Sequence, residues 1–276
     1  MIIDAHLHFS RHEHMGVIAR EAGHVNEPEH LKLVFRECGI ALGVVMGNEE
    51  MLDLHAGPPL RFCFGVRGER LKDRESCAAE LARAERVLET PDCAGIKIYL
   101  GYDYRYPADG AFLPFYELAG AYGQAVVFHT GDTSGSKGKI KYAHPLGVDE
   151  VAVDFPKTQF VLAHCGNPWI VDAVEVAAKN ANAALDLSGL AIGNFDVDEL
   201  YKRYEGYWKH LAMWIDYLSD DSKIMFGTDW PLVNIPAYLQ LMRRVVPERA
   251  HEAFFSANAK RIFKLPELPA PAPANA

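Results

Sequence analysis

The sequence of 276 residues predicts an α/β protein with the (β/α)8 TIM-barrel fold. Three observations support this fold. Eight short apolar runs alternate with helical patterns, no linker interrupts the series, and the length suits one large domain. A doubly wound open sheet is the alternative, but no glycine-rich phosphate loop follows the first apolar run. We therefore expect one barrel domain over residues 1–264, followed by a tail over residues 265–276.

The predicted strands are apolar runs that end near polar residues or glycine. They cover residues 1–7, 40–46, 61–66, 93–100, 124–129, 159–164, 183–188 and 223–229. Because successive side chains of a strand point to opposite faces, Asp4, His6 and His8 should share one face of the first strand. The other face should carry its apolar residues, Ile3, Ala5 and Leu7.

Helical spacing of apolar residues predicts the elements between these strands. The predicted helices cover residues 28–38, 75–88, 113–122, 146–154, 169–179, 198–218, 235–246 and 248–263, with a short one near 49–55. Residues 9–15 are expected to form a polar loop. The tail is rich in proline and alanine and lacks an apolar face, so it is predicted to be disordered.

Composition excludes several classes of partner. The chain has 28 basic and 37 acidic residues and a formal charge of −9, which argues against nucleic acid or an anionic membrane. No run approaches the roughly 18 apolar residues that span a bilayer. The five cysteines contain no C-x-x-C pair and no signal-peptide pattern is visible, so we expect a cytoplasmic protein.

Polar residues at the ends of the predicted strands carry the functional prediction, because functional groups of this fold lie at the carboxyl ends of its strands. These residues are His6, His8, Lys97, His129, His164 and Asp229. If Ile96 and Ile98 face the outer helices, Lys97 points into the barrel, where an unpaired ammonium is costly. Imidazole and carboxylate ligands suit a divalent cation, and a catalytic site leaves one position for water. The pattern predicts a metal site.

The same segments resemble the signatures of the amidohydrolase superfamily. The resemblance is closest to the amidohydrolase-2 branch, which includes the aminocarboxymuconate-semialdehyde and resorcylate decarboxylases. The matching segments are Asp4-Ala-His6-Leu-His8, Gly95-Ile-Lys97, Phe128-His129-Thr130, Ala163-His164-Cys165-Gly166-Asn167, Gly227-Thr228-Asp229-Trp230-Pro231 and the closing Asn258–Phe263. The resemblance implies a barrel of the metal-dependent hydrolase type.

The resemblance also implies a ligand set. His6, His8, His129 and Asp229 would bind a metal, usually zinc, and His164 would either polarise the attacking water or bind the metal directly. Two-metal members of the superfamily carry a carbamylated lysine at the end of the fourth strand. Lys97 stands at about that place, so the site could hold one ion or two.

We expect a hydrolase that directs a metal-activated water at an amide, lactone or ester-like bond of a small organic substrate, which could carry a carboxylate. Asp229 would accept the proton of that water, and His164 would stabilise the developing oxyanion. One alternative in the same fold is the non-oxidative decarboxylation of an aromatic or dienoic acid, with Asp229 protonating carbon. An alternative of another class is a metal-binding scaffold without catalysis.

Residues just beyond the strand ends are candidates for substrate contact: Arg67, Tyr99, Asn167 and Trp230. An arginine there could bind a carboxylate in bidentate fashion, although a surface ion pair explains Arg67 equally well. Residues 195–214 contain more aromatic side chains than one inward helix face needs. This excess predicts a homodimer.

Overall fold

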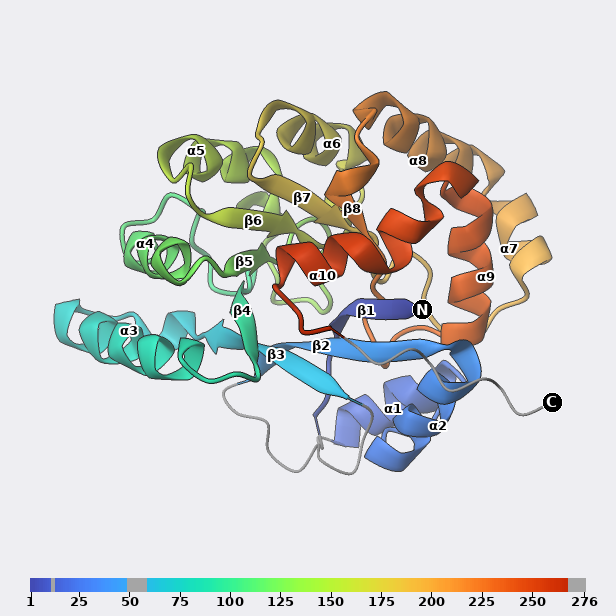
Figure 1. Cartoon of the computed structure of the whole chain (residues 1–276), viewed down its shortest axis with the longest axis horizontal. Helices are drawn as coiled ribbons and strands as arrows, with labels where there is room; N and C mark the ends of the chain where they lie inside the picture. The colour runs from blue at the N-terminus through green and yellow to red at the C-terminus, as the bar shows by residue number, and fades with distance from the viewer. Residues whose placement is uncertain (11–12, 49–58, 268–276) are drawn as a thin grey trace.

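The barrel is formed by eight parallel strands whose spatial order follows the sequence. The computed structural model describes residues 1–10, 13–48 and 59–267 (Figure 1). The strands are β1 Ile2–Leu7, β2 Ile40–Asn48, β3 Leu60–Val66, β4 Cys93–Ile98, β5 Ala125–Phe128, β6 Gln159–Leu162, β7 Ala183–Asp186 and β8 Ile224–Met225. The barrel closes between β1 and the residue that follows β8, since the Ala5 N–H donates to the Phe226 carbonyl at 2.9 Å. The predicted TIM barrel is confirmed, and the open sheet is excluded.

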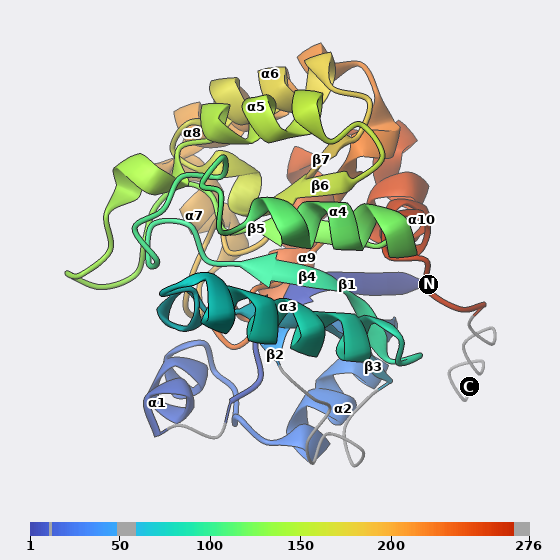
Figure 2. The ribbon, with the colours of Figure 1, turned by 90° about the vertical axis from the view of Figure 1, so that its left-hand side faces the viewer.

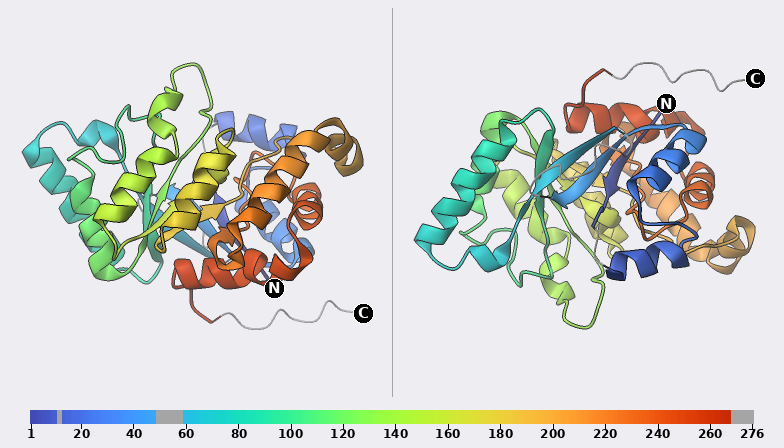
Figure 3. Two further views of the ribbon diagram at one scale, coloured as in Figure 1. Left: turned by 90° about the horizontal axis from the view of Figure 1, so that it is seen from above. Right: turned by 90° about the horizontal axis from the view of Figure 1, so that it is seen from below.

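Helices pack against the outside of the barrel (Figures 2 and 3). They are α1 Glu13–Glu21, α2 Pro28–Cys38, α3 Arg74–Leu88, α4 Leu113–Tyr122, α5 Leu146–Asp154, α6 Ile170–Lys179, α7 Val197–Arg203, α8 Glu205–Leu218, α9 Ile235–Val245 and α10 Asn258–Ile262. α2 begins with Pro28 in its first turn and ends at Gly39, which takes the left-handed conformation (φ +70°) typical of a glycine after a helix.

Three helical predictions differ from the structure. α1 begins where a polar loop was expected, and the predicted helix 198–218 is split at Tyr204 into α7 and α8. The predicted helix 248–263 is divided into three parts, which are a 3-10 turn Glu248–Ala250, a π-helical turn Ala253–Ala257 and α10. The short helix predicted near 49–55 lies outside the described residues.

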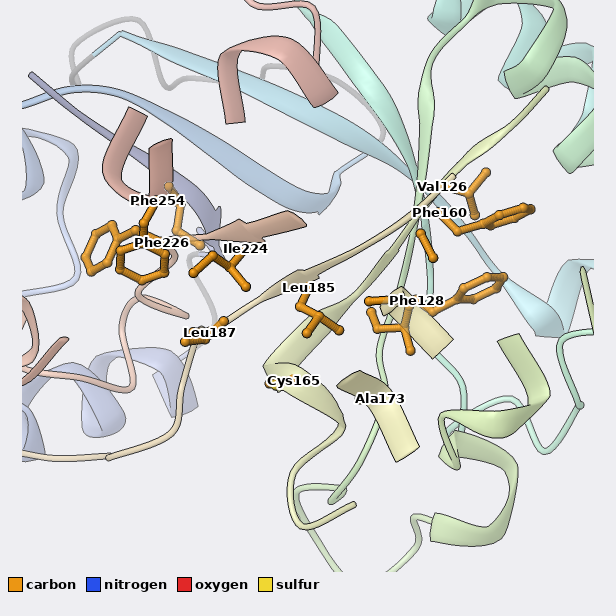
Figure 4. Packing of buried hydrophobic residues seen from close by; sticks show 14 of the residues in the cluster. Val126, Phe128, Phe160, Cys165, Ala173, Leu185, Leu187, Ile224, Phe226 and Phe254 are labelled. Atoms are coloured by element: carbon orange, nitrogen blue, oxygen red, sulfur yellow. The ribbon is translucent and has the colours of Figure 1, made fainter. Parts of the chain in front are cut away.

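Two apolar layers hold the barrel together. The outer layer lies between strands and helices, where Phe128, Phe160 and Phe226 pack (Figure 4). The inner layer fills the barrel and continues into α10, whose Ile262 packs with it. Leu265 is also buried in this inner layer, so ordered packing extends beyond the predicted domain end at 264. Residues 268–276 of the predicted tail lie outside the described part.

β1 does not keep the strict alternation that was predicted. Ile3 and Ala5 belong to the inner layer, but Leu7 belongs to the outer one. The pairing with β2 shifts register between Asp4 and Leu7, which inserts one residue as a β-bulge does. Both carboxylate oxygens of Asp4 accept hydrogen bonds from Thr228, and Asp4 is not in the group of clustered ligand atoms that contains His6.

The aromatic excess near α8 is divided between core and surface. Trp208 is buried, whereas Tyr204 and Tyr217 are exposed. The homodimer stays a prediction, which sedimentation at micromolar concentration would test. Among the described helices, none is long and apolar enough to cross a membrane.

Phe160 offers a test of the outer layer. Its ring is fully buried and stacks on Phe128 with centroids 5.8 Å apart. Phe160→Ala should lower the free energy of unfolding by about 3–5 kcal/mol in urea titrations, because it opens a cavity. Val153→Ala on α5, at a side chain that is 55% exposed, is the control and should change stability by less than about 0.5 kcal/mol. Equal effects of the two changes would contradict this packing.

Candidate metal centre

Three polar side chains converge at the carboxyl end of the barrel. His6, His164 and Asp229 each present a ligand atom, and these atoms lie within 4.8 Å of one another. Nε2 of His6 is 3.6 Å and Nε2 of His8 is 3.1 Å from Oδ1 of Asp229. Nδ1 of His164 is 3.9 Å from Oδ2 of the same carboxylate. Strand β1 and the segments that follow β6 and β8, far apart in sequence, thus supply one cluster.

Asp229 is held by local backbone geometry. It follows β8 in a left-handed conformation with φ +59°, and its N–H donates to the His6 carbonyl at 2.7 Å. A Cβ at Gly189 would lie 2.7 Å from Oδ2 of Asp229, so glycine leaves room for the carboxylate. Burial alone would raise the pKa of Asp229, but His164 and His8 hold it well below its usual value. The carboxylate is ionised.

His164 lies in a turn rather than at the strand end that was predicted. β6 stops at Leu162, and His164 takes a left-handed conformation with φ +60°. This sparsely populated conformation for a non-glycine residue is typical of functional sites. Its Nδ1 lies 3.1 Å from the carbonyl oxygen of Ser188, an acceptor, so Nδ1 carries a proton.

His129 follows β5 and contacts His164 rather than joining the three-residue cluster. Its Nε2 donates to the carbonyl oxygen of Asp132 at 2.8 Å. Its Nδ1 lies 3.1 Å from Nε2 of His164. Burial lowers the pKa of His129 well below its ordinary value, as do His164 and Lys97, so the ring is neutral. Its predicted role as a metal ligand stays a prediction.

Asp186, at the end of β7, is a functional residue that sequence reasoning missed. Its Oδ2 accepts a hydrogen bond from Nδ1 of His6 at 2.9 Å, and its Oδ1 accepts from the backbone N–H of His164 at 3.1 Å. The carboxylate therefore orients two members of the cluster. The available signal was the alternation of apolar Leu185 and Leu187 with Asp186 and Ser188.

The Asp186 contact makes Nε2 of His6 an acceptor. Burial lowers the pKa of His6 to about 3, so the ring is neutral, with its single proton on Nδ1. Within the described part of the chain, the buried Nε2 has no hydrogen-bond partner, and it faces Oδ1 of Asp229, another acceptor. Two facing acceptors are unfavourable unless a cation lies between them. The residues present therefore fit a divalent cation.

Lys97 points into the barrel as predicted. Ile96 and Ile98 pack in the outer layer, and Lys97 between them is fully buried. Its Nζ makes no hydrogen bond to any residue that the structure describes, and lies 5.3 Å from the ring centroid of Tyr99. Burial lowers the pKa of Lys97 to about 8.

The predicted substrate residues lie in different surroundings. The Tyr99 hydroxyl donates to the Met46 carbonyl, and its ring centroid is 6.2 Å from that of His8, so it flanks the cluster. Arg67 is exposed beyond β3.

The side chains of Asn167 and Trp230 contact residues outside the cluster. Oδ1 of Asn167 accepts a hydrogen bond from Tyr207 of α8 at 3.0 Å. Trp230 is fully buried against His24, with ring centroids 4.7 Å apart, rather than open beside the cluster. The structure thus brings Tyr99, but not Trp230, to the cluster.

The family follows from a comparison of the whole sequence. A family model described as amidohydrolase matches residues 3–265. The chain belongs to the amidohydrolase family. No curated protein matches this amidohydrolase.

Solved structures share its fold at low identity. An amidohydrolase from Burkholderia multivorans with bound zinc is 17% identical (TM-score 0.61), with 96% of this chain and 100% of that chain covered. The 5-carboxyvanillate decarboxylase of Sphingomonas paucimobilis is 16% identical (TM-score 0.59; 96% and 98% covered). A probable 2-pyrone-4,6-dicarboxylic acid hydrolase from Acinetobacter baumannii is 15% identical (TM-score 0.62; 96% and 99% covered). These likenesses show the fold.

Replacing Asp186 tests its orienting role. Asp186→Asn should weaken zinc binding about 10–100-fold. The carboxylate accepts hydrogen bonds from both His6 and His164, whereas the amide NH2 group cannot accept one and would face one of these donors. Competition with a chromophoric chelator measures the dissociation constant. Asp149→Asn, which removes a surface partner of Lys179, is the control and should leave the constant unchanged. Unchanged zinc affinity in Asp186→Asn would refute this role.

Proposed function

We propose that this amidohydrolase is a metal-dependent hydrolase that acts on an amide, lactone or ester-like bond of a small organic substrate. The observation that carries the proposal is that the two carboxylate oxygens of Asp229 face different groups. Its Oδ1 faces His6 and His8, and its Oδ2 faces His164. One carboxylate thus lies between the candidate ligands and a protonated imidazole nitrogen, which suits a group that transfers protons.

His6, His8 and Asp229 would hold the cation, with His129 or His164 completing the set. We propose zinc, which takes imidazole and carboxylate ligands and is bound in the Burkholderia multivorans amidohydrolase. When bound, such an ion lowers the pKa of water towards about 7 and polarises a carbonyl group.

The protein's own residues then have distinct roles. Asp229 accepts a proton from the attacking water and passes it to the leaving group. His164 would stabilise the oxygen that gains negative charge, and its Nδ1–H donates to the Ser188 carbonyl, which holds the ring in place. Asp186 orients the His6 ring and keeps its proton on Nδ1, while burial keeps the ring neutral.

A decarboxylase is the second candidate, because one observation favours a carboxylated substrate. The buried ammonium of Lys97 has no acceptor among the described residues, and a substrate carboxylate would supply one. Asp229 would then protonate carbon. The 5-carboxyvanillate decarboxylase of Sphingomonas paucimobilis shares the fold.

The two reactions are separated by their products. The zinc-loaded protein is incubated in H2(18)O with panels of lactones, esters, amides and aromatic carboxylic acids. Incorporation of (18)O into a new acid supports the hydrolase. Carbon dioxide released with no (18)O in the organic product supports the decarboxylase and contradicts the first proposal.

Asp229→Asn tests the proton transfer. The amide cannot accept the proton, so kcat of the zinc-loaded variant should fall about 10²–10⁴-fold on whichever substrate the panel identifies. Asp132→Asn, at an exposed carboxylate beside His129, is the matched control and should keep near wild-type kcat. A near wild-type rate in zinc-loaded Asp229→Asn would rule out this role.

A further inference from the structure

The turn that carries Asp229 lies beyond the end of regular strand pairing. β8 ends at Met225, and the chain then runs close to β1, where a Cβ at Gly227 would lie 2.8 Å from Cβ of His6. The backbone N–H groups of Thr228 and Asp229 both donate to the His6 carbonyl oxygen, at 3.1 Å and 2.7 Å. Two donors share one acceptor, so these bonds attach the turn to β1 without determining the conformation at Asp229.

The side chains of Asp4 and Thr228 form a buried network beside this turn. Oδ1 of Asp4 accepts hydrogen bonds from the backbone N–H groups of Thr228 and His6, at 2.9 Å and 3.2 Å. Its Oδ2 accepts from the Thr228 hydroxyl at 2.6 Å. The Asp4 carboxylate therefore joins the strand that carries His6 to the turn that carries Asp229.

The Thr228 hydroxyl is also joined to the residue after Asp229. A backbone N–H can only donate, and that of Trp230 donates to Oγ1 of Thr228 at 3.0 Å. A hydroxyl has one proton and two acceptor sites, so Oγ1 accepts from Trp230 while its own proton goes to Asp4. The bond from Trp230 closes a ring that contains the Asp229 backbone, as serine and threonine side chains do in turns.

Asp229 needs this ring because its backbone is in the left-handed region, at φ +59°. That region is sparsely populated by residues other than glycine, and it persists where neighbouring contacts hold it. In this conformation, Oδ1 lies 3.1 Å from Nε2 of His8 and Oδ2 lies 3.9 Å from Nδ1 of His164. A backbone rotation to a commoner region would turn the carboxylate away from both rings.

We propose that Thr228 is a positioning residue of the candidate metal centre. Its hydroxyl, held by Asp4, fixes the left-handed turn and so presents the Asp229 carboxylate to the histidines. The hydroxyl bonds to Asp4 and to the Trp230 backbone, and it acts on the centre through Asp229. This inference rests on the proposed function only in taking Asp229 as a ligand of the cation.

A purely structural role is the competing explanation, because the same network joins β1 to the chain beyond β8. Backbone bonds already join these segments, however. The His8 N–H, for example, donates to the Trp230 carbonyl at 2.7 Å. Barrel closure therefore does not depend on the Thr228 side chain alone, whereas the ring around Asp229 does. Metal affinity and stability should respond differently when the hydroxyl is removed.

Zinc affinity is the first measurement, made by competition with a chromophoric chelator. Thr228→Val has nearly the same shape but no hydroxyl, and it should raise the zinc dissociation constant about 10–100-fold, as the loss of a group that orients a ligand does. Thr228→Ser keeps the hydroxyl and should stay within about threefold of the wild type. Thr158→Val removes an equally buried hydroxyl, which donates to the Tyr116 carbonyl at 2.8 Å, and should leave the constant unchanged.

The absorption spectrum of the cobalt-loaded protein is the second measurement, because its visible bands report the coordination geometry. Thr228→Val should change these bands, whereas Thr228→Ser and Thr158→Val should keep those of the wild type. Thr228→Ala, which cannot crowd its neighbours, should match Thr228→Val and replaces it if the valine variant does not fold. Neither measurement requires turnover, so a failure of hydrolysis leaves both unaffected.

Two results would overturn the proposal. One is wild-type zinc affinity and a wild-type cobalt spectrum in Thr228→Val or Thr228→Ala, together with a Tm lowered as in Thr158→Val, which would assign the network a structural role only. The other is an equal loss of zinc affinity in Thr228→Ser, which would show that the hydroxyl is not the group that positions Asp229.

Discussion

The hydrogen bond from His6 to Asp186 is the contact on which the candidate metal centre depends. It joins strands β1 and β7, places the only proton of the His6 ring on Nδ1, and leaves Nε2 free to bind a cation. The second oxygen of Asp186 holds the backbone of His164, which needs support because its conformation is sparsely populated. The buried Asp186 carboxylate thus determines which nitrogen of His6 carries the proton, and it holds the backbone of His164 in place.

The fold makes this arrangement possible because the carboxyl ends of parallel barrel strands meet at one end. Apolar side chains fill the opposite end, where α10 packs against the inner layer. Polar side chains are thereby confined to the other end, and glycine supplies the space they need. Gly189 allows the Asp229 carboxylate to approach, and a Cβ at Gly65 would collide with the Gly47 carbonyl oxygen at 2.5 Å. Glycine at position 65 therefore lets strands β2 and β3 approach closely near their carboxyl ends.

The fold and most of the cluster could be predicted from sequence because both depend on local patterns. Strand periodicity located β4 well enough to direct Lys97 inward, and polar residues at strand ends identified His6 and Asp229. The bulge in β1 could not be predicted, since it arises from pairing with β2 and reverses the side on which Leu7 packs. Asp186 was missed because its partner His6 is 180 residues away in the chain and no local pattern joins them.

We propose that these strand ends form a centre for a single catalytic divalent ion. Elemental analysis of the protein purified without chelators, referenced to protein concentration by amino-acid analysis, tests it most directly. We predict close to one equivalent of a divalent metal, zinc in our proposal, per chain. A preparation that contains no metal and takes up none from zinc buffers would contradict the metal centre. Two equivalents per chain would contradict a single ion beside a free Lys97.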